Sequence, residues 1–116
     1  WLHDAGSGAI LEVNPAACAM FGYTAQEQRA MGVEGLLPHG LGYTMERAWE
    51  AARRCIAGEI EFYDWMGRRK DGQLLWMEMR IRPVTLGGRA CLLATARDVT
   101  ARKAAEAALA RTEESY

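Results

Sequence analysis

The feature of this sequence that most constrains its fold is a change of hydrophobic period at Gly58. Before this glycine, the segment Tyr43 to Ile56 has apolar residues three and four positions apart, which predicts an amphipathic helix. After it, apolar and polar residues alternate, as in strands with one buried face. The alternation covers three long runs, Glu59 to Arg69, Gln73 to Val84 and Ala90 to Thr100. A helical region followed by three consecutive strands predicts an α+β domain.

Glycine-containing turns join the three predicted strands. Lys70-Asp71-Gly72 and Leu86-Gly87-Gly88 are hairpin turns in which glycine supplies a positive φ. Two shorter strands, Trp1 to His3 and Ala9 to Val13, are expected at the start of the chain. Strands linked by hairpins are antiparallel, so the helices between the second and third strands must cover one face of the sheet.

Two short helices are predicted between the second strand and the longer helix. Asn14 followed by Pro15 combines an N-cap side chain with a proline at the first helical position. Thr24 and Glu27 have the spacing of a capping box. The following segment, Gly32 to Gly42, is glycine-rich and is expected to be a loop with one helical turn.

Length, charge and cysteine content exclude several classes of protein. A chain of 116 residues fits one domain, and its formal net charge of −1 gives no field that would attract nucleic acid or an anionic membrane. Cys18, Cys55 and Cys91 lack metal-ligand or disulfide spacing, so we expect small buried thiols in a reducing cytoplasm and no metal site. The chain starts within a strand pattern and stops within a helical one, which suggests a fragment of a longer protein.

An ordered set of short motifs extends along almost the whole chain. The motifs are Asn14-Pro15-Ala16-Ala17, Phe21-Gly22-Tyr23-Thr24, Arg69-Lys70-Asp71-Gly72, Trp76-Met77-Glu78 and Asp98-Val99-Thr100 with Arg102-Lys103. Each motif alone is weak, but their order and spacing together resemble a PAS sensory domain of the S-box kind, including its C-terminal PAC motif.

The resemblance implies an antiparallel five-stranded sheet in the order 2-1-5-4-3, with short helices on one face enclosing a cavity. It implies a PAS domain at residues 1–100, truncated in its N-terminal flank, and a signalling or linker helix at residues 101–116. It also implies a cytoplasmic sensory and dimerisation module of a bacterial signal-transduction protein. The parent protein would be a sensor histidine kinase of a two-component phosphorelay, a cyclic-di-GMP enzyme or a transcription regulator, with further PAS or output domains.

Strand parity gives the candidate lining of the cavity. Small residues of the last strand are assigned to the helix-facing side, together with the matching residues of the strand before it. On the third strand the resemblance favours Tyr63 and Trp65 inward, although Phe62 and Met66 allow the opposite parity. The candidates are Trp49, Tyr63, Trp65, Met77, Met79, Ile81, Leu92, Ala94 and Ala96. The same residues also suit a filled core, which is the favoured interpretation.

Some PAS cofactors need a particular residue type at a particular position, and the sequence can be checked for it. Haem-binding PAS domains take an axial histidine from the helix before the third strand, but Tyr43 to Ile56 contains none, and His39 lies on the loop before it. Covalent flavin requires a cysteine on a short helix, and Ala25 to Gly35 has none. No cofactor is therefore favoured, with a non-covalent flavin in a redox sensor or a small organic ligand as alternatives.

Nothing in the sequence predicts catalysis by this segment. Glu59, Glu61 and Glu78 lie on predicted strands with nothing to orient them as an acid and base pair. With only His3 and His39 available, no Ser/His/Asp arrangement can be drawn. Any enzymatic activity is expected in a neighbouring domain.

The C-terminal segment is the strongest functional signal. Residues 101–116 are rich in helix formers, but their seam consists only of small residues, namely Ala101, Ala105, Ala108 and Thr112. A helix with so little to bury needs a partner helix, which a homodimer would supply. A pure dimerisation relay without a ligand is the alternative to a ligand sensor.

Two further pairs of residues complete the predicted sites. Asp98 and Thr100 lie where the last strand meets the terminal helix, with Thr100 as N-cap and Asp98 accepting hydrogen bonds, and the resemblance implies a role in signal relay. Trp76 and Leu93 are assigned to the outer face of the sheet, where an exposed Trp76 would contact a partner. Alternatively, neighbouring arginine stems cover its ring.

Overall fold

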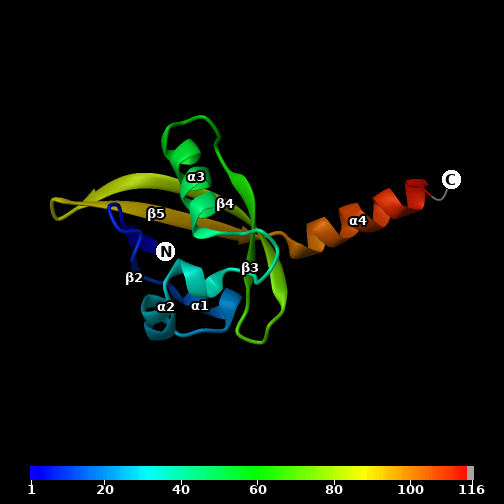
Figure 1. Ribbon diagram of the computed structural model, residues 1–116, viewed down its shortest axis with the longest axis horizontal. Helices are drawn as coiled ribbons and strands as arrows, with labels where there is room; N and C mark the ends of the chain where they lie inside the picture. Colours follow the sequence, from blue (N-terminus) through cyan, green and yellow to red (C-terminus); the bar gives the residue numbers. More distant parts are fainter. Residues whose placement is uncertain (115–116) are drawn as a thin grey trace.

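A single antiparallel sheet organises the chain. The structure is a computed structural model that describes residues 1–114, and within them five strands pair in the order β2-β1-β5-β4-β3 (Figure 1). The strands are β1 (Leu2–Asp4), β2 (Ile10–Glu12), β3 (Tyr63–Arg68), β4 (Leu74–Leu86) and β5 (Arg89–Asp98). The α+β fold and the predicted strand order are confirmed.

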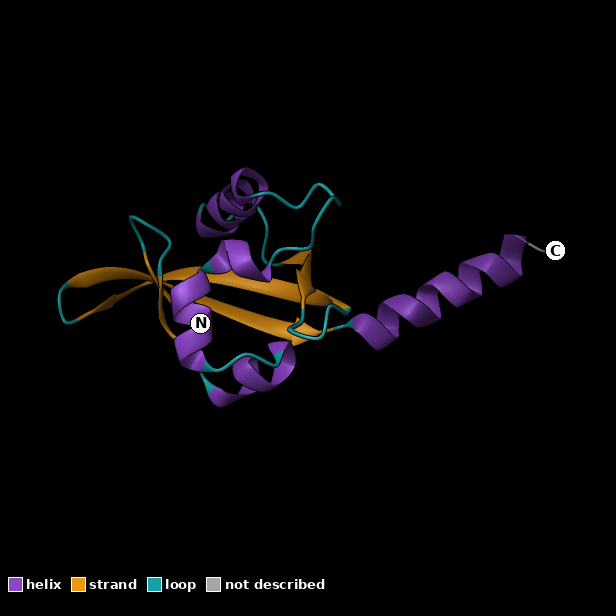
Figure 2. Cartoon of the chain, turned by 60° about the horizontal axis from the view of Figure 1, so that its bottom comes forward, coloured by secondary structure: helices purple, strands orange, loops and turns teal. Residues whose placement is uncertain are grey.

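The helices between β2 and β3 gather against the sheet, whereas the last helix projects away from it (Figures 1 and 2). The helices between β2 and β3 are α1 (Pro15–Phe21), α2 (Ala25–Met31), the 3₁₀ turn η1 (Val33–Leu36) and α3 (Met45–Ile56). The last helix is α4 (Thr100–Glu114). Asn14 caps α1 by accepting a hydrogen bond from Ala17, and Thr24 with Glu27 forms the predicted capping box of α2. The part of the predicted terminal helix at residues 115–116 lies outside the described residues.

Local hydrogen bonds move two predicted boundaries. Helix α3 begins at Met45 and not at Tyr43, because the Thr44 hydroxyl accepts the Arg47 N–H at 3.2 Å and caps the helix. Strand β3 begins at Tyr63 and not at Glu59, because the Glu59 N–H donates to the Arg54 carbonyl at 3.0 Å and extends the turn after α3. The apolar spacing also predicts that Ile56 is buried on the inner face of α3, which is wrong, because Ile56 is 38% exposed.

Buried side chains between the helices and the sheet form the core. Cys55 replaces Ile56 as the last buried residue of α3, and its thiol accepts the Ile81 N–H at 3.4 Å. At the other end of the sheet Phe21 packs on Gly67, where an added Cβ would lie 2.6 Å from the ring carbon Cζ. A residue larger than glycine at position 67 would therefore displace Phe21, which is 1% exposed.

Two of the three cysteines match the expectation of buried thiols. Cys55 and Cys91 are buried free thiols, as expected, but Cys18 is only partly buried. No helix within residues 1–114 is long and apolar enough to cross a membrane.

Candidate functional site

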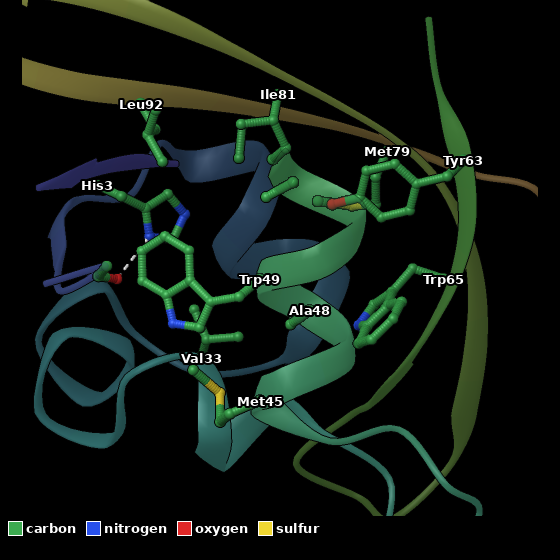
Figure 3. Close-up of a pocket in the computed structure, with 13 residues that line it drawn as sticks. His3, Val33, Met45, Ala48, Trp49, Tyr63, Trp65, Met79, Ile81 and Leu92 are labelled. Atoms are coloured by element: carbon green, nitrogen blue, oxygen red, sulfur yellow. Dashed lines mark hydrogen bonds between the residues drawn. The ribbon is translucent and has the colours of Figure 1, made fainter. Parts of the chain in front are cut away.

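A cavity of about 100 Å³ lies between α3 and the inner face of the sheet (Figure 3). Tyr63 and Trp65 both face it, so the favoured parity of β3 is the observed one. Most of the predicted lining residues surround it, namely Trp49, Tyr63, Trp65, Met79, Ile81, Leu92 and Ala94. The filled core favoured from the sequence is therefore interrupted by a small space.

Two predicted lining residues lie elsewhere. Met77 lines an adjoining cavity of about 60 Å³ beside Phe21, because it lies two residues before Met79 on β4. Ala96 lines neither cavity, because it lies opposite Met79 near the end of β5, where its small side chain packs into the core. The prediction for Ala96 as a lining residue is wrong for this conformation.

The sequence prediction missed lining residues from β1, the turn after it, η1 and α3. They are His3, Gly8, Val33, Met45, Ala48 and Ala52. His3 could have been found from strand register: it lies opposite Leu92, and residues directly opposite in an antiparallel pair share a face. That register depends on pairing the first strand with the last, which no short motif reveals.

Trp49 forms one wall of the cavity and extends from α3 to the β1–β2 turn. A Cβ added to Gly8 would lie 2.7 Å from the ring atom Cζ2 of Trp49, so the indole rests on the backbone of that turn. The side chain remains 38% exposed and therefore lies at the edge of the cavity.

Two polar side chains lie in this mainly apolar lining. The His3 ring nitrogen Nδ1 lies 3.0 Å from the Gly8 carbonyl oxygen, and burial lowers the pKa of His3 more than this hydrogen bond raises it. Burial also raises the pKa of Tyr63, with a smaller contribution from Cys55. Both side chains are therefore uncharged at neutral pH.

A hydrogen-bonded corner connects the sheet to α4. The Asp98 carboxylate accepts the Thr100 N–H at 2.9 Å and the Thr100 hydroxyl at 2.6 Å, which confirms that Asp98 accepts bonds from the junction. The Thr100 hydroxyl also accepts the Trp76 N–H at 3.0 Å. Thr100 is the first helical residue and not the N-cap, because the Val99 carbonyl before it accepts the Lys103 N–H at 2.9 Å.

Charged contacts hold the first turn of α4 against β3 and β4. The Lys103 ammonium lies 2.6 Å from the Asp64 carboxylate and 5.2 Å from the centre of the Trp76 ring. Arg102 lies 3.5 Å from the Glu78 carboxylate. We call these five residues the α4 clamp. Each exposed pair is weak alone, but together they fix the direction in which the helix leaves.

The expectation of an exposed Trp76 needs correction. Its side chain is partly buried, with Lys103 over the ring and the Tyr43 ring edge-on at 6.4 Å between centroids. The chain's own exit helix, and not an arginine stem, provides this cover. Leu93 is also partly buried, and it pairs with Leu2 and Arg82 across the sheet.

The described residues contain no group of three or more His, Cys, Asp or Glu side chains placed to hold a metal ion. His39 is exposed on its loop. Glu78 pairs with Arg97 at 3.1 Å, as expected for a carboxylate on a solvated sheet face.

Comparisons with known proteins agree with this architecture. A family model described as PAS domain matches residues 1–101. A PAS domain from Desulfitobacterium hafniense is similar with a TM-score of 0.67 at 23% identity, over 84% of this chain and 88% of that one. A sensory box histidine kinase/response regulator from Burkholderia thailandensis has a TM-score of 0.70 at 20% identity, over 99% and 86%.

A PAS domain from a two-component sensor histidine kinase has a TM-score of 0.61 at 18% identity, over 84% of this chain and 81% of that one. No curated protein sequence matches the chain at a significant level.

Proposed function

The chain belongs to the PAS domain family, and on this basis we propose that it is a sensory module of an intracellular signal-transduction protein. In this proposal, a change in the cavity beneath α3 alters how α4 leaves the sheet. Helix α4 then passes the change to an output domain of the same protein. The segment itself performs no catalysis.

The observation that supports this proposal is that the same strands line the cavity and contact the start of the exit helix. Met79 on β4 lines the cavity, and three residues earlier Trp76 donates its N–H to Thr100 at the start of α4. Ala94 on β5 also lines the cavity, and the same strand ends at Asp98. A displacement of either strand would therefore reach the first turn of α4 through short hydrogen bonds.

The names of similar structures support a choice of output. Two of them are described as parts of sensor histidine kinases, one together with a response regulator. A histidine kinase in a phosphorelay is therefore our proposed output, with a cyclic-di-GMP enzyme as the alternative.

The cavity volume favours a small ligand over a flavin. Pockets for drug-sized ligands typically measure about 300–1,000 Å³, whereas this cavity measures about 100 Å³. An isoalloxazine ring would require α3 to move away from the sheet. A redox sensor with non-covalent flavin is accordingly less well supported than a sensor of a small molecule.

A relay without ligand is the second candidate, and the surface of α4 supports it. Beyond its first turn the described side chains of α4 are exposed, and Leu109 is 60% exposed. A parallel pairing of two such helices would cover this leucine and the alanine seam. We therefore include homodimerisation through α4 in the proposed function.

Filling the cavity tests the coupling. Ala48→Leu extends a side chain from α3 into the cavity, and we expect faster amide hydrogen exchange in the first turn of α4 by about threefold or more. Ala51→Leu is the matched control, because Ala51 lies on the same helix but lines neither cavity. Unchanged exchange at residues 100–104 in a folded Ala48→Leu protein would falsify the coupling.

A second variant tests the corner in the protein that contains this domain. Asp98→Ala removes the acceptor of both Thr100 hydrogen bonds while the sheet keeps its core. We expect a native circular dichroism spectrum but altered output activity. Unchanged output would exclude Asp98 from signal relay.

A further inference from the structure

His3 presents an unused hydrogen-bond acceptor to the cavity. Because the Gly8 carbonyl can only accept, the Nδ1 atom of His3 must carry the proton of the bond between them. In the neutral ring, Nε2 then has a free lone pair. Figure 3 shows this second nitrogen pointing toward the middle of the cavity. No hydrogen bond to this nitrogen is formed within residues 1–114.

Tyr63 presents a hydroxyl to the same space from the opposite side. Its ring packs edge-on against Trp65 at 6.2 Å between centroids, which directs the hydroxyl toward α3 (Figure 3). No hydrogen bond to this hydroxyl is formed within residues 1–114, and the raised pKa keeps it protonated. Both side chains are only partly buried, so water can satisfy them when the cavity is empty. In an apolar pocket a few polar groups fix the orientation of a ligand, and His3 and Tyr63 are the two that this lining offers.

The lining limits the size and charge of that occupant. An apolar cavity of about 150 Å³ accommodates benzene, so a cavity of about 100 Å³ suits a ring of five or six atoms after slight adjustment. The side chains around the cavity are uncharged, and the flat Trp49 ring forms one wall. A charged ligand would be buried here without a counter-ion, at high cost.

We propose that the cavity binds a small uncharged aromatic ring bearing one O–H group, which donates to Nε2 of His3 while the ring packs against the apolar lining. Phenol is the smallest hydroxylated member of this class. The inference rests on the proposed sensory function and specifies the ligand of the same cavity. His3 is then the specificity-determining residue, and Gly8 positions it by fixing which nitrogen carries the proton.

The test compares phenol with benzene, which has the same ring but no hydroxyl. We expect phenol to bind about fivefold more tightly, as one net hydrogen bond would provide. Binding is followed by ¹⁵N NMR of the His3 ring, where phenol but not benzene should shift the Nε2 resonance. Equal affinities, or binding of phenol without a shift of Nε2, would overturn the proposal.

Variants of the two polar side chains test which of them binds the hydroxyl group. His3→Phe should abolish the preference for phenol while retaining benzene, which also shows that the cavity is intact. Tyr63→Phe removes the hydroxyl on the opposite side of the cavity and should change neither the preference for phenol nor the tautomer of His3. Thr95→Ala, on the outer face of β5, is a control that should change neither affinity.

Failure of this inference is distinguishable from failure of the sensory proposal. If neither ring binds, the ligand class is wrong, whereas the effect of Ala48→Leu on α4 is measured without any ligand. If phenol binds as expected but Ala48→Leu leaves α4 unchanged, the cavity is a binding site without the proposed output.

Discussion

At the scale of single residues, Gln28 is the clearest case of a side chain whose role depends on distant partners. It is fully buried, accepts the Trp1 indole N–H at 2.8 Å and donates to the carbonyls of Ala17 and Tyr23, both at 3.3 Å. It thereby joins the start of the sheet to α1 and to the loop before α2. A buried amide is stable only when such bonds are made.

Replacing Gln28 tests this cluster. Gln28→Leu leaves the Trp1 N–H and two carbonyls without partners, so we expect the free energy of unfolding to fall by about 2–3 kcal/mol. Urea denaturation measures the change. Gln26→Leu, on the exposed face of the same helix, should change stability by less than about 0.5 kcal/mol. Similar losses in both variants would contradict the assigned role of Gln28.

The range of each interaction explains which residues could be predicted. Asn14 and Thr24 were predicted as helix caps because their partners lie three residues ahead. His3 and Gln28 were missed because their environments depend on strand pairing and on contacts 27 residues or more away. Cys55 was missed in the stripe of α3 because its burial depends on its contact with β4.

At the scale of elements, the β1–β2 hairpin depends on one carboxylate. Asp4 accepts hydrogen bonds from the Ser7 N–H at 2.8 Å and the Ser7 hydroxyl at 2.9 Å, and Arg89 lies 3.1 Å away. The bonds from Ser7, followed by Arg89, lower the pKa of Asp4 to about 2. The turn that positions Gly8 against Trp49 is therefore fixed best when Asp4 is ionised.

This lowered pKa predicts a pH dependence of stability. Asp4 has a pKa of about 2 when folded and about 3.9 when unfolded, so between these values the unfolded state binds more protons. The stabilisation by Asp4 is complete above about pH 4 and is lost as the pH falls toward 2. In urea denaturation, the difference between the wild type and Asp4→Asn should shrink over this range. A constant difference would mean that Asp4 does not titrate as described.

Element boundaries illustrate the limits of sequence patterns. The alternation after Gly58 continues from Glu59, but only residues from Tyr63 onward pair with β4. The residues before it instead follow the end of α3, where Arg53 and Arg54 contact the Glu59 carboxylate. A hydrophobic pattern reports which side chains are buried, whereas the start of a strand depends on where its partner strand lies.

At the scale of the whole molecule, α4 makes the domain elongated, with principal extents of 58 × 33 × 24 Å. The strand order was predictable because the ordered motifs resembled a known family, and a family specifies topology. The size of the cavity was not predictable, because it depends on how side chains from β1, η1, α3 and three other strands pack together.

Self-association is the prediction that belongs to this scale. If α4 pairs with its copy, Leu109→Gln should weaken the dimer by about tenfold, since a buried leucine contributes about 1.5–3 kcal/mol. Analytical ultracentrifugation measures the change. Leu41→Gln is the control, because Leu41 is 49% exposed on a loop far from α4 in the sequence. Equal effects of both variants, or a monomer at all concentrations, would exclude dimerisation through α4.

The α4 clamp also has a consequence for domains that follow. Because its contacts fix the first turn of α4, the clamp sets the rotational phase of any domain attached rigidly to the helix. Each inserted residue would turn that domain by about 100°, whereas seven would return it to within about 20° of its starting angle. The length of the connecting helix, counted in heptads, therefore determines the orientation in which this domain holds the domain that follows.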